Sequence, residues 1–141
     1  MLIFIDSSVV VAALFSSTGA SAEIFELCEM SFCKAVISEC VVDEVERTLK
    51  KKSIEHLNIF RDLLKISKVK ILPKPTKKEL NTASSWIKDP DDVHILASAK
   101  SVNVDALLTL DIRHFIKDEN VSRLSGLDIF TPGEFLNSID F

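Results

Sequence analysis

Short apolar runs alternate with longer amphipathic segments along most of the chain. The runs predict strands at residues 2–5, 35–37, 69–72, 106–110 and 127–130. The amphipathic segments predict helices at residues 8–15, 20–32, 39–52, 53–66, 76–87 and 90–102, a helical turn at 112–116, and a last helix from Pro132. This order predicts an α/β protein, a three-layer α/β/α sandwich with a central, mostly parallel sheet of about five strands.

The length of 141 residues suits one domain, which we expect to span residues 1–141. The longest apolar stretch, Val9 to Phe15, is too short to cross a membrane. The first residues contain no basic leader, so we expect a cytoplasmic protein without a membrane partner. Three cysteines (Cys28, Cys33 and Cys40) form no CxxC pair, which predicts reduced, buried thiols.

Charge is distributed unevenly within a net value of −4. Residues 47–78 contain eleven Lys and Arg and only two acids, a local charge of +9, whereas the remainder carries −13. Such asymmetry could place a surface that attracts phosphate beside an acidic pocket. A pair of solvated lysine-rich helices would give the same pattern.

Four acids follow apolar runs or begin helices. Asp6 and Asp111 directly follow predicted strands, and Glu44 and Asp92 lie near the starts of predicted helices. In a parallel α/β fold these positions share one edge of the sheet. Two carboxylates about 4 Å apart repel each other by roughly 4 kcal/mol, so a converging group predicts a bound cation or shifted pKa values. Mg²⁺ or Mn²⁺ fits this oxygen-only set, because no His or Cys stands at ligand spacing.

Each acid taken alone has a structural explanation. Asp6 and Asp111 could cap the helices that follow them, and Asp92 could offset the dipole of its helix. Glu44 could be an ordinary solvated helix residue. Helix capping does not explain Glu44, however, and the dipole requires only one acid after Pro90 where the chain has two. The four together favour a functional site.

Five segments of the chain resemble the blocks of a PIN domain, in that family's order and spacing. They are residues 2–9 (LIFIDSSV), 38–49, 89–99 (DPDDVHILASA), 106–115 (ALLTLDIRHF) and 131–136 (TPGEFL). The resemblance implies a small α/β/α sandwich that uses Mg²⁺ or Mn²⁺ to cut single-stranded RNA.

The resemblance also implies roles for individual residues. Asp6, Glu44, Asp92 and Asp111 would be the catalytic acids, with Asp6, Asp92 and Asp111 binding the metal. Thr109 would be the family's supporting hydroxyl, and Ser8 stands where many members have Asn. Two positions have rivals, since Asp91 competes with Asp92 and Asp43 with Glu44; the apolar face formed by Leu96 and Ala99 favours Asp92.

A metal-dependent endoribonuclease is therefore the leading hypothesis. A divalent ion held by carboxylates lowers the pKa of bound water, and attack of that water on phosphorus would leave a 5′-phosphate and a 3′-hydroxyl. Glu44 could hold a second ion or orient the water. Members with this short layout are often toxins paired with an antitoxin protein, so we expect an antitoxin partner and a homodimer. Ile24, Phe25 and Leu27 could serve such a dimer or simply the core.

Other functions fit the sequence less well. An RNA-processing PIN nuclease that is not a toxin, or an inactive PIN-fold binding module, would share the same segments. A phosphatase of the haloacid dehalogenase type needs an Asp at position 8, where this chain has Ser8. A receiver domain needs a lysine after a late strand, and none follows the predicted strand at residues 127–130. His56, His94 and His114 look isolated, with His114 expected at the surface. Arg113 could contact a phosphate or be a plain surface residue.

Overall fold

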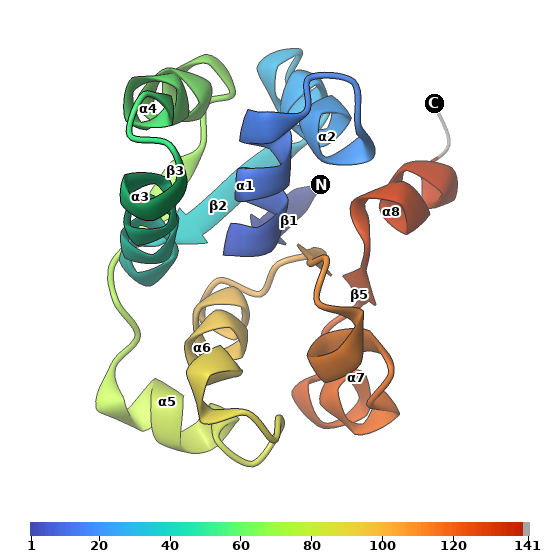
Figure 1. Ribbon diagram of the computed structural model, residues 1–141. Helices are drawn as coiled ribbons and strands as arrows, with labels where there is room; N and C mark the ends of the chain where they lie inside the picture. Colours follow the sequence, from blue (N-terminus) through green and yellow to red (C-terminus); the bar gives the residue numbers. More distant parts are fainter. Residues whose placement is uncertain (140–141) are drawn as a thin grey trace.

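The computed structural model describes residues 1–139 and contains one parallel sheet (Figure 1). Its five strands lie in the order β3-β2-β1-β4-β5. They are β1 (Leu2–Ile5), β2 (Lys34–Ser38), β3 (Lys70–Leu72), β4 (Ala106–Leu108) and β5 (Ile129–Phe130). Helices cover both faces, so the predicted three-layer α/β/α fold is confirmed.

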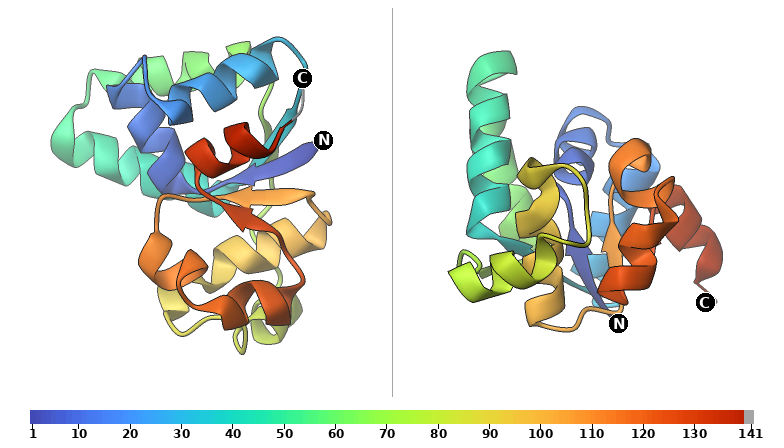
Figure 2. Two further views of the ribbon diagram at one scale, coloured as in Figure 1. Left: turned by 90° about the vertical axis from the view of Figure 1, so that its right-hand side faces the viewer. Right: turned by 90° about the horizontal axis from the view of Figure 1, so that it is seen from below.

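The two helical layers are seen edge-on in Figure 2. One layer contains α1 (Ser7–Phe15), α2 (Ala20–Glu29), α3 (Glu39–Lys52), α4 (His56–Ile66) and α8 (Pro132–Ser138). The other contains α5 (Lys77–Ala83), α6 (Val93–Ser101) and α7 (Glu119–Ser125), with two short helical turns, η1 (Pro90–Asp92) and η2 (Ile112–Ile116). Among the described residues, no single helix is long and apolar enough to cross a membrane, although α1 and α2 together, bent by 96°, reach that length and composition.

The order in which strands are added to the sheet reverses at β1. The chain runs outward through β2 to β3, then returns across the sheet to place β4 on the other side of β1. Ile5 is paired with Leu108, and the N–H of Asp6 donates to the carbonyl of Leu108 at 3.0 Å. The carboxyl ends of β1 and β4 therefore lie side by side at the topological switch point, where α/β folds bind ligands.

Apolar side chains from the strands and the inner helix faces form one core. Val41, Val45 and Leu49 recur at helical spacing on α3 and are fully buried. Ile24, Phe25 and Leu27 of α2 are also buried, so they serve the core rather than a dimer surface. Cys28 and Cys33 are buried as predicted, whereas Cys40 is only half-buried; all three are free thiols.

Helix ends differ from the predicted ones where local hydrogen bonds compete. The second helix stops at Glu29 rather than residue 32, because Ser31 adopts a left-handed φ of 64°. The fifth helix stops at Ala83 rather than residue 87, and Ser84 instead bonds the carbonyl of Asn81. The fourth begins at His56 rather than residue 53, where the hydroxyl of Ser53 bonds the His56 ring at 2.6 Å. The sequence prediction missed α7 entirely.

Candidate functional site

Asp6 directly follows β1, and the chain holds both oxygens of its carboxylate. Oδ1 accepts a hydrogen bond from the N–H of Ser7 at 2.8 Å. Oδ2 accepts from the hydroxyls of Ser8, at 2.7 Å, and Thr109, at 2.8 Å. Only 7% of Asp6 is exposed, and this burial raises its pKa, although the hydrogen bonds from Ser8 and Thr109 act in the opposite direction. Asp6 is thus a buried carboxyl in a fixed position.

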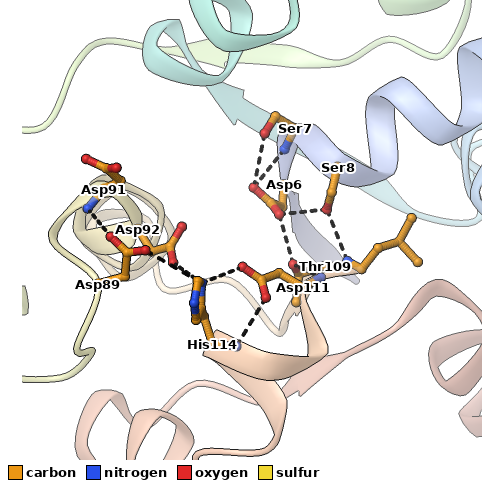
Figure 3. Close-up of polar contacts among 10 residues, drawn as sticks. Asp6, Ser7, Ser8, Asp89, Asp91, Asp92, Thr109, Asp111 and His114 are labelled. Carbon is orange, nitrogen blue, oxygen red and sulfur yellow. Dashed lines mark hydrogen bonds and ion pairs between the residues drawn. The ribbon is translucent and has the colours of Figure 1, made fainter. Parts of the chain in front are cut away.

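The same two hydroxyls join the end of β1 to the loop after β4. The Ser8 hydroxyl accepts from the N–H of Leu110 at 3.1 Å, and the Thr109 hydroxyl accepts from the N–H of Asp111 at 3.0 Å. Each hydroxyl therefore donates to Asp6 and accepts from the loop that carries Asp111. Ser8 and Thr109 have the geometry of supporting groups (Figure 3).

Three further carboxylates surround one imidazole. His114 Nδ1 lies 2.9 Å from Asp111 Oδ2, 3.1 Å from Asp92 Oδ2 and 3.7 Å from Asp89 Oδ2 (Figure 3). The turn η2 is π-helical, and its last bond runs from the N–H of Lys117 to the carbonyl of Ile112. The backbone N–H of His114 also donates to Asp111 Oδ1 at 3.1 Å. This wide turn directs the histidine ring back toward the sheet edge, and turns of this kind are frequent at functional sites.

The carboxyl of Asp92 is strongly affected by its surroundings. Burial, followed by repulsion from Asp111 and Asp89, raises the pKa of Asp92 to about 6, against the opposing charge of His114. Asp92 Oδ2 is also shielded from solvent, and the His114 ring is its one polar partner among the described residues. Negative charge in this part of the site is therefore only partly neutralised by the protein.

Glu44 approaches from α3 on the opposite side. Its Oε2 accepts from the hydroxyl of Ser7 at 3.2 Å, and its Oε1 pairs with His94 Nε2 at 2.5 Å. Burial opposes ionisation of this carboxyl, but the hydrogen bond and charge of His94 outweigh it, so the pKa of Glu44 is lowered. The charge of Glu44 in turn raises the pKa of Asp6.

The structure thus brings together the four acids singled out from the sequence and adds Asp89. We call these five residues (Asp6, Glu44, Asp89, Asp92 and Asp111) the acidic cluster. Asp92 faces the cluster, whereas the exposed Asp91 points away from it (Figure 3). The other rival, Asp43, is also exposed and pairs with Lys74 at 3.5 Å. The geometry favours Asp92 and Glu44 over these two neighbours.

Sequence reasoning missed three participants. Asp89 caps η1, since its Oδ1 accepts from the N–H of Asp91, but its Oδ2 also faces His114. His114, expected at the surface, turns its ring toward three carboxylates. His94 looked isolated in the sequence but pairs with Glu44. The wide η2 turn brings His114 inward, and His94 meets Glu44, an acid from another helix, rather than Asp92. Only the closeness of His114 to Asp111 in the sequence hinted at this arrangement.

The sequence model of the PIN domain family matches residues 2–113, from β1 into η2. The chain belongs to the PIN domain family. The matched segment contains every member of the acidic cluster, and His114 lies one residue beyond it. PIN domains are generally nucleases. No curated protein matches the chain in sequence.

Solved structures share the fold of this PIN domain at low sequence identity. VapBC2 from Rickettsia felis, bound to a DNA fragment from its promoter, gives a TM-score of 0.65 at 18% identity, covering 93% of this chain and 98% of that one. FitAB bound to the IR36 DNA fragment gives 0.62 at 15% identity, with coverage of 92% and 94%. A domain of a functionally unknown protein from Methanocaldococcus jannaschii gives 0.54 at 25% identity, with coverage of 92% and 89%.

Side chains of this PIN domain fit a divalent cation. Among the described residues, Asp89, Asp92 and His114 offer ligand atoms that all lie within 4.8 Å of one another. The buried Asp92 Oδ2 contacts only the His114 ring, and a cation would satisfy its remaining acceptor capacity. This group shares only Asp92 with the ligand set expected from the sequence, and it contains an imidazole nitrogen that the sequence prediction had excluded. A mixed oxygen and nitrogen set suits Mn²⁺ better than Mg²⁺, which prefers oxygen ligands.

Proposed function

We propose that this PIN domain is a divalent-metal-dependent endoribonuclease that cuts single-stranded RNA. The observation that carries the proposal is the convergence of the acidic cluster at the ends of β1 and β4. Glu44 and Asp92 reach it from separate helices, and Asp6 is held there by Ser8 and Thr109. Asp6 and Asp92 fit no purely structural role, because burial raises the pKa of each and so opposes its ionisation.

Mg²⁺ or Mn²⁺ would be held by Asp6, Asp92 and Asp111, with Asp89 and His114 as further ligands on the exposed side. When bound, such an ion lowers the pKa of a water ligand and offsets the charge of a phosphate oxygen. Ser8 and Thr109 fix the orientation of the Asp6 carboxylate through their hydroxyls. Glu44, kept ionised by His94, would hold a second ion or orient the attacking water.

The decisive experiment is a cleavage assay on mixed-sequence RNA with Mn²⁺, with and without chelator. We expect the unsubstituted chain to cut RNA only with metal and Asp6→Asn to lose at least about a hundredfold in rate, since one oriented ligand is removed. Asp91→Asn is the matched control, because it removes a neighbouring but outward-facing carboxylate. Equal activity of Asp6→Asn and Asp91→Asn, with both variants folded by circular dichroism, would refute the proposal.

We further infer that this nuclease is the toxin of a toxin–antitoxin pair and acts in the cytoplasm as a homodimer bound to its antitoxin. Support comes from the two complexes of similar fold, VapBC2 and FitAB, both of which were solved with DNA. Exposed apolar side chains on and beside α4 (Ile54, Ile59 and Ile66) offer surface for a protein partner. Expression of the chain alone should arrest growth, and co-expression of the neighbouring gene should restore it. Harmless expression of an RNA-cutting chain would favour the RNA-processing alternative.

A binding module without catalysis is the remaining alternative. It predicts no heat of binding when Mn²⁺ is titrated into the protein by calorimetry. The proposed nuclease predicts saturable binding that Asp92→Asn weakens.

A further inference from the structure

A cavity of about 440 Å³ adjoins the acidic cluster on the side of η2. It is lined by Ile87, Lys88, Asp89, Arg113, His114 and Asp118. Asp89 and His114 thus have one side toward the cluster and one toward the cavity. Its volume falls in the range of roughly 300–1,000 Å³ that is usual for small-ligand sites.

The cavity contains a guanidinium with no carboxylate partner. Among the described residues, Arg113 makes no ion pair and no side-chain hydrogen bond, although Asp89 and Asp118 line the same cavity. Its five donors remain available, and their planar arrangement matches two oxygens of a phosphate. Arg113 is one residue from His114, so the π-helical turn that brings the imidazole to the acids presents the guanidinium beside them.

Lys88 provides a second cation in the lining of the cavity. Its ammonium lies 3.8 Å from Asp118 Oδ2, and its side chain is 91% exposed. Such an exposed, loosely paired contact contributes little stability, so Lys88 can turn to an incoming anion at small cost. The cavity therefore offers two positive groups next to a site that is otherwise strongly negative.

An anionic polymer that approaches the acidic cluster needs positive charge besides a metal ion. We propose that this cavity binds the backbone phosphate next to the one that is cut, with Arg113 as its bidentate ligand and Lys88 as a second contact. This inference rests on the proposed function for its ligand, single-stranded RNA. It concerns a different set of residues from those that carry the chemistry.

The test measures binding of a fluorescent single-stranded RNA of mixed sequence at several salt concentrations. Asp6→Asn serves as the background, in the presence of Mn²⁺, so that the RNA stays intact. We expect Arg113→Ala to weaken binding about tenfold, as for loss of a charge-assisted contact. It should also reduce the slope of log affinity against log salt by about 0.7, the value for one phosphate contact on a single strand.

Lys117→Ala is the matched control, because it removes an exposed charge from the same segment that does not line the cavity. It should change neither affinity nor slope. Arg113→Lys should keep the slope but recover only part of the affinity, since an ammonium cannot bind two oxygens in a plane. Equal slopes for Arg113→Ala and Lys117→Ala would overturn the phosphate site.

Cleavage by the unsubstituted chain, measured in parallel, separates the two proposals. If the unsubstituted chain cuts RNA and the Arg113→Ala slope is unchanged, the phosphate site is wrong and the nuclease proposal stands. If the Asp6→Asn protein binds RNA through Arg113 but the unsubstituted chain does not cut it, the phosphate site stands without the nuclease. Absence of both binding and cleavage would overturn both.

Discussion

Asp92 is a single carboxyl that ionises against the charges of its neighbours. Burial and the two acids Asp111 and Asp89 raise its pKa to about 6, well above the ordinary 3.8. A carboxyl with a raised pKa favours the folded state most when both states are protonated, below about pH 3.8. That contribution is lost as the pH rises through 6, where the folded protein must ionise the group.

Asp92→Asn should therefore stabilise the metal-free protein at pH 7, by about 1 kcal/mol after allowance for solvent screening. The gain should shrink as the pH falls and disappear near pH 4, where Asp92 is protonated and resembles the amide. Urea unfolding at pH 4, 5, 6 and 7 in chelator measures this. Asp91→Asn, on the exposed side of the same turn, is the control. A gain that does not depend on pH would show that the effect is steric rather than electrostatic.

The sequence predicted a residue of the site only where the order of strands and helices determines its position. Asp6 and Asp111 follow strands, so their shared edge could be inferred from topology alone. Asp89 and His114 reach the site because the segments around η1 and η2 turn toward it. The spacing of residues in the sequence does not predict the direction of those turns. The choice of Asp92 over Asp91 rested on the apolar face of α6, and buried Leu96 and Ala99 on that face are consistent with it.

At the scale of elements, α7 shows how a helix can escape detection by its apolar pattern. It has seven residues and buries Val121 and Ser125, too few for a clear periodicity. Its ends are well marked, however: Asp118 accepts from the N–H of Asn120, and Gly126 ends the helix with a left-handed φ of 73°. The signals that predict this helix are those of its caps.

Gly126→Ala should destabilise the protein by about 1 kcal/mol, because a side chain strains the left-handed conformation. Space is not limiting, since the added Cβ would meet only the flexible end of Lys100 at 3.3 Å. Gly133→Ala is the comparison: it lies in α8 with nothing within 4 Å of the new atom. That change should be neutral or stabilise by about 0.5 kcal/mol. Thermal unfolding of both variants measures the two changes in stability. Equal changes in Tm for Gly126→Ala and Gly133→Ala would contradict the strain argument.

Most other elements were predictable because their caps and apolar faces agree. Ser38 caps α3 by accepting from the N–H of Val41, and Thr76 forms a capping box with Glu79 at the start of α5. The errors occur where a serine hydroxyl makes a local hydrogen bond at the helix end, to the His56 ring at Ser53 and to the Asn81 carbonyl at Ser84. These local alternatives differ by too little free energy for a pattern of apolar residues to decide between them.

At the scale of the whole molecule, the acidic cluster couples stability to metal. The cluster holds repelling charges together in the folded chain and releases them on unfolding, so a cation that binds only the folded state stabilises it.

Mn²⁺ at a hundred times its Kd should add about 2.7 kcal/mol and raise Tm by about 5–10 °C at pH 7.5. At pH 5 the rise should be much smaller, because protonated Asp92 is a poor ligand. Asp6→Asn should reduce the rise at pH 7.5, whereas Asp43→Asn, which alters an exposed acid on α3, should leave it intact. An equal rise at both pH values would place the ion elsewhere.

The hydroxyl that steadies Asp6 belongs to a residue 103 positions further along the chain. Strand β4 must insert beside β1 before Thr109, Asp111 or His114 can reach their places. The acidic cluster can therefore form only after most of the chain has been synthesised. Fragments that end before residue 106 lack the closing strand and cannot assemble the acidic cluster.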